Sequence, residues 1–207
     1  MSSQRRSFKT DILRLGPVVA LAIVVTGCGR NAASAERSNP AAVHERYLAV
    51  LPNNTAIYGR GERVVAVRRE GEILWEGAIP SGDALIAPIA VALNSTAYLR
   101  GKKALHLVGS DGKWLWSRPL DGEAAGKNPE VNAPTTFPDS TAAVVVGDDI
   151  LRFDSKGVVL WRFSLPEGHV VAHPRAGMDG ALFVQSSAGM YCLSPEGNVS
   201  WMRAIGN

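Results

Sequence analysis

Gly157-Val158-Val159-Leu160-Trp161-Arg162-Phe163-Ser164-Leu165 is one of four copies of a motif that organises the chain. The motif reads Gly, three residues, Trp, three residues, then Leu or Ile. The other copies span residues 71–79, 112–120 and 197–205. Their tryptophans lie 41, 45 and 40 residues apart: Trp75, Trp116, Trp161 and Trp201. A period of about 40 to 45 residues is typical of a β-propeller or of a helical array.

Short strand-like runs precede every copy of the motif and favour the propeller. An apolar run and a turn come directly before each glycine, at 64–67, 105–108, 150–153 and 191–193. A second run lies further upstream, at 55–58, 96–99, 142–146 and 181–184. A proline precedes three of these upstream runs: Pro88, Pro134 and Pro174. Each unit therefore predicts four short strands, and the chain predicts an all-β propeller of four four-stranded blades.

The strand that carries the tryptophan is apolar in both of its alternating registers in the first three copies, and in one register in the fourth. Two residues before the tryptophan stand Ile73, Trp114, Val159 and Val199, and four after it stand Ile79, Leu120, Leu165 and Ile205. The opposite register holds Leu74, Leu115, Leu160 and Ser200. Residues at even spacing share a face of a regular strand. We therefore expect this strand to pack between two layers, with the four tryptophans as structural residues of the repeat.

The positive charge of the chain belongs to its first residues. Of 22 basic and 19 acidic residues, four and one respectively lie within residues 1–27, so 18 of each remain. The rest of the chain has no net charge, so it lacks the excess of positive charge that favours binding to a nucleic acid. We expect no nucleic-acid partner.

Residues 1–27 have the pattern of an export signal. Basic residues precede an apolar run from Leu15 to Val25, which is short for a membrane span. The run ends in Val25-Thr26-Gly27-Cys28, which resembles the lipobox of bacterial lipoproteins. That resemblance implies cleavage before Cys28, lipidation of its thiol and attachment to a bilayer; an uncleaved anchor is the alternative. Arg5-Arg6 leaves both ordinary export and the twin-arginine route open.

The domain limits follow from these features. Residues 28–43 are rich in Ala, Asn, Ser and charge and predict a flexible tether after the lipidated cysteine. The propeller repeats span residues 44–207, and Asp121–Pro129 is their longest connection. Gly29 follows the cysteine where an Asp would favour retention at an inner membrane. We expect a periplasm-facing protein anchored at the outer membrane in preference to the inner.

Few residues are candidates for catalysis or for binding a metal or cofactor. His169 and His173 stand four apart in the first predicted strand of unit four, without further metal-ligating residues at suitable spacing. Cys192 is the only thiol besides Cys28, and in an apolar run it predicts a buried side chain. Turn aspartates and one basic hairpin complete the set: Asp148, Asp149, Asp154, Arg60, Arg63, Arg68 and Arg69. We expect no catalytic, cofactor-binding or metal-binding residues.

The segment Asp154–Trp161, an Asp-x-x-Gly turn followed by x-x-x-Trp, resembles the repeat of PQQ-like β-propellers. The resemblance extends over residues 44–207. Some members of this family are quinoprotein dehydrogenases that bind pyrroloquinoline quinone and calcium. Others are non-catalytic, among them BamB-like lipoproteins of the outer-membrane β-barrel assembly machinery. A lipobox followed directly by these repeats is similar to the second group, and no residue matches a quinone or calcium site, so no cofactor is implied.

The resemblance implies a non-catalytic, lipid-anchored scaffold that binds envelope proteins. An enzyme of the quinoprotein type and a small-ligand sensor, both using the central channel, are the alternatives. Most propellers of the family have more than four blades. Four blades close alone, form an open arc or pair with a second copy as a homodimer, and the sequence does not choose among these arrangements.

Overall fold

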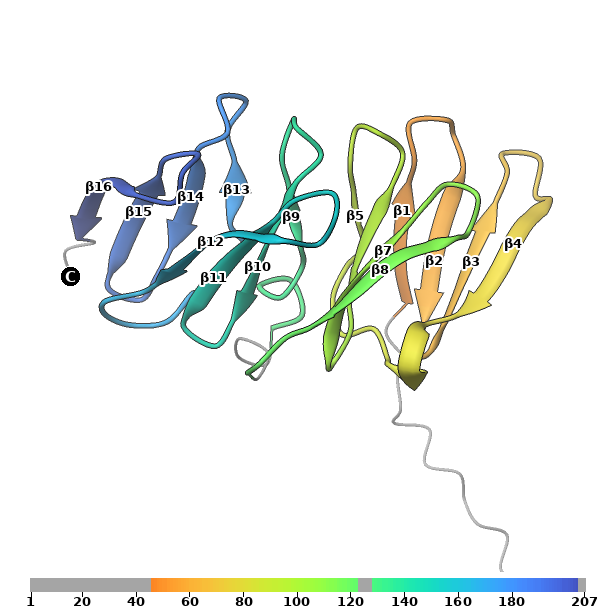
Figure 1. Ribbon diagram of the computed structural model, residues 1–207, viewed down its shortest axis with the longest axis horizontal. Helices are drawn as coiled ribbons and strands as arrows, with labels where there is room; N and C mark the ends of the chain where they lie inside the picture. Colours follow the sequence, from red (N-terminus) through yellow and green to blue (C-terminus); the bar gives the residue numbers. More distant parts are fainter. Residues whose placement is uncertain (1–45, 123–127, 205–207) are drawn as a thin grey trace, which may run out of the picture. The chain divides into compact units, whose positions relative to one another are not determined.

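A computed structural model describes residues 46–122 and 128–204 (Figure 1). The chain divides into two compact units, Met1–Pro40 and Ala41–Asn207, and all described residues belong to the second. The expected signal, Cys28, the tether and Ile205 lie outside the described residues. The one helix among the described residues is the 3-10 turn η1 (Pro80–Gly82). No described helix has the length and apolar character needed to cross a bilayer.

The described residues form four antiparallel sheets of four strands each, as the repeat predicts. Each sheet consists of consecutive strands in chain order. The first sheet contains β1 (Arg46–Val50), β2 (Ala56–Arg60), β3 (Arg63–Val67) and β4 (Ile73–Ala78). The second contains β5 (Ala90–Val91), β6 (Ala97–Arg100), β7 (Ala104–Val108) and β8 (Trp114–Pro119). The third contains β9 (Thr135–Thr136), β10 (Ala142–Val146), β11 (Asp149–Phe153) and β12 (Val159–Ser164). The fourth contains β13 (Arg175–Ala176), β14 (Leu182–Gln185), β15 (Gly189–Leu193) and β16 (Val199–Ala204).

The first strand of each sheet lies innermost. β1 contacts β5, β5 contacts β9, and β9 contacts β13, so successive sheets are neighbours along these strands. The strands β5, β9 and β13 have two residues each and begin just after Pro88, Pro134 and Pro174. Proline has no N–H to donate to a ladder, so these prolines delay the start of each inner strand.

Three apolar cores fill the spaces between the four sheets. Ile57 and Val64 of the first sheet pack with Leu99 of the second. Tyr98 and Leu105, on the other side of the second sheet, pack against residues of the third such as Val144. The third core joins the third and fourth sheets: Val145, Ile150, Leu182, Val184 and Leu193. A sheet between two others thus buries both faces, which explains the apolar residues in both registers of β6, β7 and β10.

The tryptophan strands differ from the expected strand packed on both faces. β4, β8, β12 and β16 are the outermost strands of their sheets, and Ile73 and Leu160 are 59% and 51% exposed. A register shift lies just before each tryptophan: Trp75 is opposite Ala66, whereas Ile73 is opposite Val67. Such a bulge turns residues two apart towards opposite faces. The prediction that this strand packs on both faces was wrong, because residues at even spacing share a face only when the strand is regular.

Candidate functional site

Each tryptophan of the first three sheets packs on the glycine turn of the next sheet. Their indole Nε1 atoms donate to the backbone carbonyl two residues before the next motif glycine, at 2.9 Å each: Trp75 to Ser110, Trp116 to Ser155 and Trp161 to Pro195. The glycines of these turns have φ between +79° and +86°: Gly112, Gly157 and Gly197. A Cβ on any of them would lie 2.6–2.8 Å from the indole, so the indole rests on bare backbone. We call this arrangement a tryptophan junction.

The fourth tryptophan and the first glycine turn form no such junction with any residue that the structure describes. Trp201 is 41% exposed, and among the described residues its ring contacts Phe183 with the centroids 6.2 Å apart. Gly71 has φ +89°, the same conformation as the other three glycines, but a Cβ there would meet nothing within 4 Å. Among the described residues, the Gly71 turn therefore has no indole on it, and Trp201 has no glycine turn under it.

The two sheet faces around these residues carry exposed apolar side chains. The entry face of the first sheet includes Leu48, Val50, Tyr58 and Ile73, and the charged Arg60, Arg63 and Glu76 lie on the same face. The exit face of the fourth sheet includes Phe183, Met190 and Trp201, together with the polar Gln185 and Arg203. Tyr58 and Phe183 are each 38% exposed. The residues at the same repeat positions in sheets that have a neighbour on that side are at most 2% exposed. These residues are Leu99, Val144 and Val184 for Tyr58, and Ile57, Tyr98 and Ala143 for Phe183. Exposed apolar patches of this kind mark interaction surfaces.

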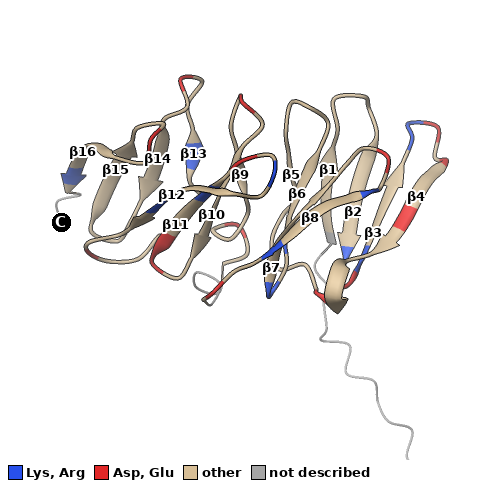
Figure 2. Cartoon of the chain, in the orientation of Figure 1, with Lys and Arg blue, Asp and Glu red and all other residues tan. Residues whose placement is uncertain are grey.

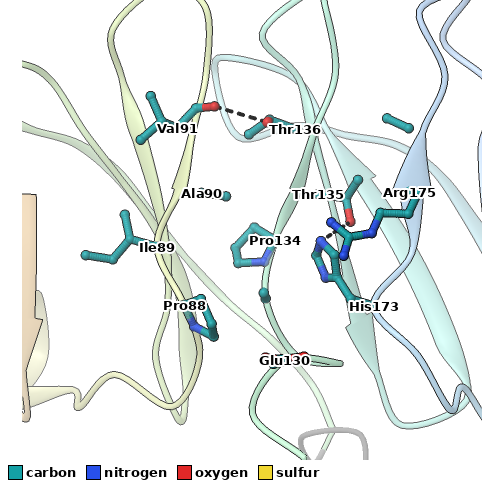
Figure 3. Close-up of a pocket in the computed structure, with 12 residues that line it drawn as sticks. Pro88, Ile89, Ala90, Val91, Glu130, Pro134, Thr135, Thr136, His173 and Arg175 are labelled. Carbon is teal, nitrogen blue, oxygen red and sulfur yellow. Dashed lines mark hydrogen bonds between the residues drawn. The ribbon is translucent and has the colours of Figure 1, made fainter. Parts of the chain in front are cut away.

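A pocket of about 490 Å³ lies along the inner strands of the last three sheets. Pro88 and Ile89 form one side of it, Thr135 and Thr136 of β9 the middle, and the segment from His173 to Ala176 the other side (Figure 3). Thr136 donates its hydroxyl hydrogen to the Val91 carbonyl at 3.1 Å, which ties β9 to β5. The pocket therefore has a wall held together by cross-sheet hydrogen bonds.

His173 and Arg175 are the basic residues of this pocket and lie beside Thr135 (Figure 3). Burial lowers the pKa of His173, and the positive charge of Arg175 lowers it further, so the imidazole is neutral at pH 7. Its Nε2 lies 3.4 Å from the Thr135 hydroxyl, which donates to the Pro174 carbonyl. The described lining also includes Glu130. The pocket suits a small polar ligand, and its Thr135 hydroxyl gives its hydrogen to the Pro174 carbonyl.

The structure separates the two histidines that the sequence placed in one strand. Neither lies in β13, which begins at Arg175. His169 is exposed and hydrogen-bonds Ser187, whereas His173 is half-buried in the pocket. The prediction of a shared strand was wrong because Pro174 shifts the inner strand beyond both residues. Among the described residues, no three His, Cys, Asp or Glu side chains lie close enough together to hold a metal ion.

Four of the other polar residues named from the sequence have local partners: Arg63, Arg68, Asp149 and Asp154. Arg63 and Arg68 of the basic hairpin pair with Glu76 and Glu72. Asp149 accepts hydrogen bonds from Arg162 and Ser164, and Asp154 accepts from two backbone N–H groups of its own turn. Charged residues of both signs lie largely in turns and at strand ends (Figure 2). Cys192 is buried, and burial raises the pKa of its thiol, so it is a poor nucleophile at pH 7.

A buried Asp–His–Ser chain joins the second sheet to the segment that precedes it. Asp83 Oδ2 lies 3.1 Å from His106 Nε2, and His106 Nδ1 lies 2.8 Å from the Ser117 hydroxyl. A carboxylate only accepts, so Nε2 carries the imidazole hydrogen and Nδ1 accepts from the serine. Although burial opposes it, hydrogen bonds from His106 and from the Lys103 and Ala84 N–H groups keep the pKa of Asp83 below its usual value.

This chain of hydrogen bonds has the order of a hydrolase triad but not its setting. Asp83 and His106 are at most 2% exposed, so the imidazole has no access to a substrate. Asp83 also accepts from the Ala104 N–H, which fixes the connecting segment to β7. We assign the cluster to structure. The sequence did not predict it because the register of β7 and β8 places His106 opposite Ser117.

Arg100 is a second buried group that the sequence did not predict. Its side chain is fully buried, and within the described part of the chain none of its three guanidinium nitrogens has a hydrogen-bond partner. Burial lowers the pKa of Arg100 to about 10, although Asp83 opposes this shift. A buried cation without hydrogen bonds is costly, so Arg100 is a strained element of the second sheet.

The family model described as outer membrane protein assembly factor BamB matches residues 60–207. The chain belongs to this family. No curated protein matches the chain.

Solved structures share the fold. BamB from Moraxella catarrhalis has a TM-score of 0.61 and 18% identity, over 77% of this chain and 48% of that one. Virginiamycin B lyase from Staphylococcus aureus has a TM-score of 0.61 and 15% identity, over 77% and 55%. The Pan2 WD40 domain from Neurospora crassa has a TM-score of 0.55 and 13% identity, over 76% and 49%. This chain thus matches about half the length of each of these chains. At such identities the likeness concerns the fold alone, and the set includes both an assembly factor and a lyase.

Proposed function

We propose that this BamB-family protein is a non-catalytic, lipid-anchored scaffold in the bacterial cell envelope that binds proteins during outer-membrane assembly. The observation that carries the proposal is membership of the family described as an outer membrane protein assembly factor. The exposed apolar sheet faces have area for contact with another protein, a second copy included. Family membership supports the envelope setting. The lipobox ending at Cys28 supports attachment to a membrane facing the periplasm, and Gly29 favours the outer one. As a further part of the proposal, two copies of the chain pair with each other.

Co-purification tests the scaffold. A tag placed after Asn207 on a flexible linker allows recovery of the full chain from gently solubilised membranes, followed by mass spectrometry of the bound proteins. We expect outer-membrane assembly proteins above the level found with an equally tagged, unrelated lipoprotein. Recovery of this chain without any envelope protein, at expression close to the natural level, would contradict the scaffold.

Ligand binding in the inner-strand pocket is a second candidate function. Its volume of about 490 Å³ and the convergence of His173, Arg175 and Thr135 favour it. Any ligand of the native state raises the melting temperature. Thermal denaturation with and without saturating calcium and pyrroloquinoline quinone tests the quinoprotein reading directly, and an unchanged melting temperature would contradict it.

A further inference from the structure

We propose that Trp201 on the exit face of one copy forms a fourth tryptophan junction with the Gly71 turn on the entry face of a second copy. The inference rests on the pairing of two copies proposed above and names the residues that make it. Three junctions within the chain have one geometry, so they serve as the template for the fourth.

The template specifies the atoms that meet. In each internal junction the indole donates to the carbonyl two residues before the motif glycine. In the first turn that residue is Arg69, so the Trp201 Nε1 donates to the Arg69 carbonyl of the second copy. Gly71 already has the positive φ of its counterparts and open space above it. No rearrangement of this turn is needed for an indole to rest on it.

Arg203 adds a second contact. It lies two residues after Trp201, as Arg118 lies two residues after Trp116. Arg118 donates from Nε to the Gly157 carbonyl at 2.8 Å and from a terminal nitrogen to the Lys156 carbonyl at 3.2 Å. By the same geometry, exposed Arg203 donates to the carbonyls of Gly71 and Glu70 in the second copy.

The apolar parts of the two faces fit the same arrangement. Phe183 and Met190 of the exit face hold the repeat positions of Ile57 and Val64, which are fully buried in the first core. Ile73 and Tyr58 of the entry face hold the positions of Trp114 and Leu99, which also pack in that core. Joining the faces therefore builds a fourth core of the same kind and removes exposed apolar surface from water.

A second copy is the occupant that this geometry favours. Among the described residues, one chain carries both halves of a further junction, namely Trp201 without a glycine turn under it and the Gly71 turn without an indole on it. In a twofold pair each copy offers its exit face to the entry face of the other, so two junctions form and all four end faces are covered. The described sheets correspond to 48% of the Moraxella catarrhalis BamB chain, so two copies supply about as many sheets as one such chain.

Native mass spectrometry of the purified full chain over a concentration series tests the inference. We expect a species of twice the chain mass. Trp201→Ala should weaken the pairing about 30-fold or more, as loss of a central interface tryptophan does. Gly71→Ala should weaken it comparably, because a Cβ occupies the space that the indole needs. Arg203→Ala should weaken it less.

Gly61→Ala is the matched control for the glycine variant. Gly61 also has positive φ and open space, so the substitution introduces comparable backbone strain in the first sheet without touching the Gly71 turn. It should leave pairing unchanged. Circular dichroism and thermal melting confirm that every variant is folded before its mass is compared.

Mixing the two defective variants gives the sharpest result. A Gly71→Ala copy keeps its Trp201, and a Trp201→Ala copy keeps its Gly71, so the mixed pair has one intact junction whereas neither variant alone has any. Mixing should therefore restore part of the pairing. Pairing that survives both substitutions, or no recovery on mixing, overturns the junction while leaving the pairing of copies in place.

A chain that is monomeric at every concentration overturns the pairing itself, whatever the co-purification experiment finds about the scaffold. A monomer that loses a different envelope protein on Trp201→Ala likewise overturns self-pairing and assigns the exit face to that protein.

Discussion

A Cβ atom on Gly197 would lie 2.6 Å from Cγ of Trp161. The indole of the third sheet thus rests directly on the backbone of the turn in the fourth, and its Nε1 donates to Pro195 in the same turn. Arg152 donates to the same carbonyl at 3.0 Å. This contact recurs between each pair of successive sheets and therefore holds the repeats in a common geometry. Its contribution to stability can be measured with variants of the tryptophan and of the glycine.

Trp161→Ala should destabilise the fold by about 3 kcal/mol, because it removes a half-buried indole from the third core and its hydrogen bond to Pro195. Trp201→Ala is the matched control, with the same residue type at the same repeat position but no following sheet. The Trp201→Ala substitution should lower the free energy of unfolding by less than about 1 kcal/mol. Urea denaturation at a concentration where the chain is monomeric measures both variants. Equal losses for the two variants would show that the junction does not stabilise the fold.

Gly197→Ala and Gly71→Ala separate backbone strain from contact. Both glycines have φ near +90°, so alanine costs about 1–2 kcal/mol at either position. At Gly197 the new methyl group also meets the Trp161 ring, whereas at Gly71 it meets open space. In the monomer, Gly197→Ala should therefore be the more destabilising by denaturant midpoint. The reverse order would contradict the described position of the indole.

Stability should fall as the pH drops below about 6.5, the ordinary pKa of histidine. Burial lowers the pKa of both His106 and His173 in the folded state. Over the range between the ordinary and the lowered pKa, the unfolded chain binds more protons, so the free energy of unfolding decreases with falling pH, by up to about 1.4 kcal/mol per pH unit for each histidine. His173→Gln should reduce this slope in pH-dependent urea titrations. An unchanged slope would mean that His173 does not contribute to it.

At lower pH, protonation of the Asp83 carboxylate lowers the free energy of unfolding further. Its pKa is lowered in the folded state, so its stabilisation is present above the ordinary value near 3.8 and is lost as the pH falls through the lowered one. Asp83→Asn should remove this acid-limb dependence while also destabilising the fold at neutral pH, because three N–H groups lose a charged acceptor.

Arg100→Met should leave the fold as stable as the native protein or more stable by about 1–3 kcal/mol. The substitution replaces a buried guanidinium without hydrogen bonds by an apolar chain of similar length. Thermal and urea unfolding measure the change, with Lys102→Met, at an exposed position, as a control for the loss of one charge. A marked loss of stability would imply that Arg100 holds an anion or a polar group in solution.

Cys28→Ser should move the chain from the membrane fraction to the soluble fraction of the periplasm or to uncleaved precursor, because serine accepts no lipid. Fractionation with immunodetection measures the shift, and metabolic labelling with a fatty acid should fail for this variant. A chain that stays in the membrane without label contradicts the lipobox interpretation.

Most of the fold could be predicted from local features of the sequence. Positive-φ glycines at Gly112, Gly157 and Gly197 were predictable because the turn chemistry lies within a few residues. The short inner strands after Pro134 and Pro174 were foreseen less well, and His169 and His173 were misplaced with them. The bulges before the tryptophans were not predicted, since an extra residue leaves no mark in a pattern of alternate apolar residues.

By itself, the sequence determined that this protein is an all-β chain of four four-stranded repeats, because apolar alternation and glycine turns act over neighbouring residues. Only the tertiary structure decided which side chains meet across sheets: Asp83 with His106 and Ser117, Arg152 with Pro195, and each indole with the next turn. It also decided that Trp201 and Gly71 have no such neighbour among residues 46–122 and 128–204. These relationships depend on strand register and on packing between residues about 40 positions apart, where the order of the sequence sets no distance.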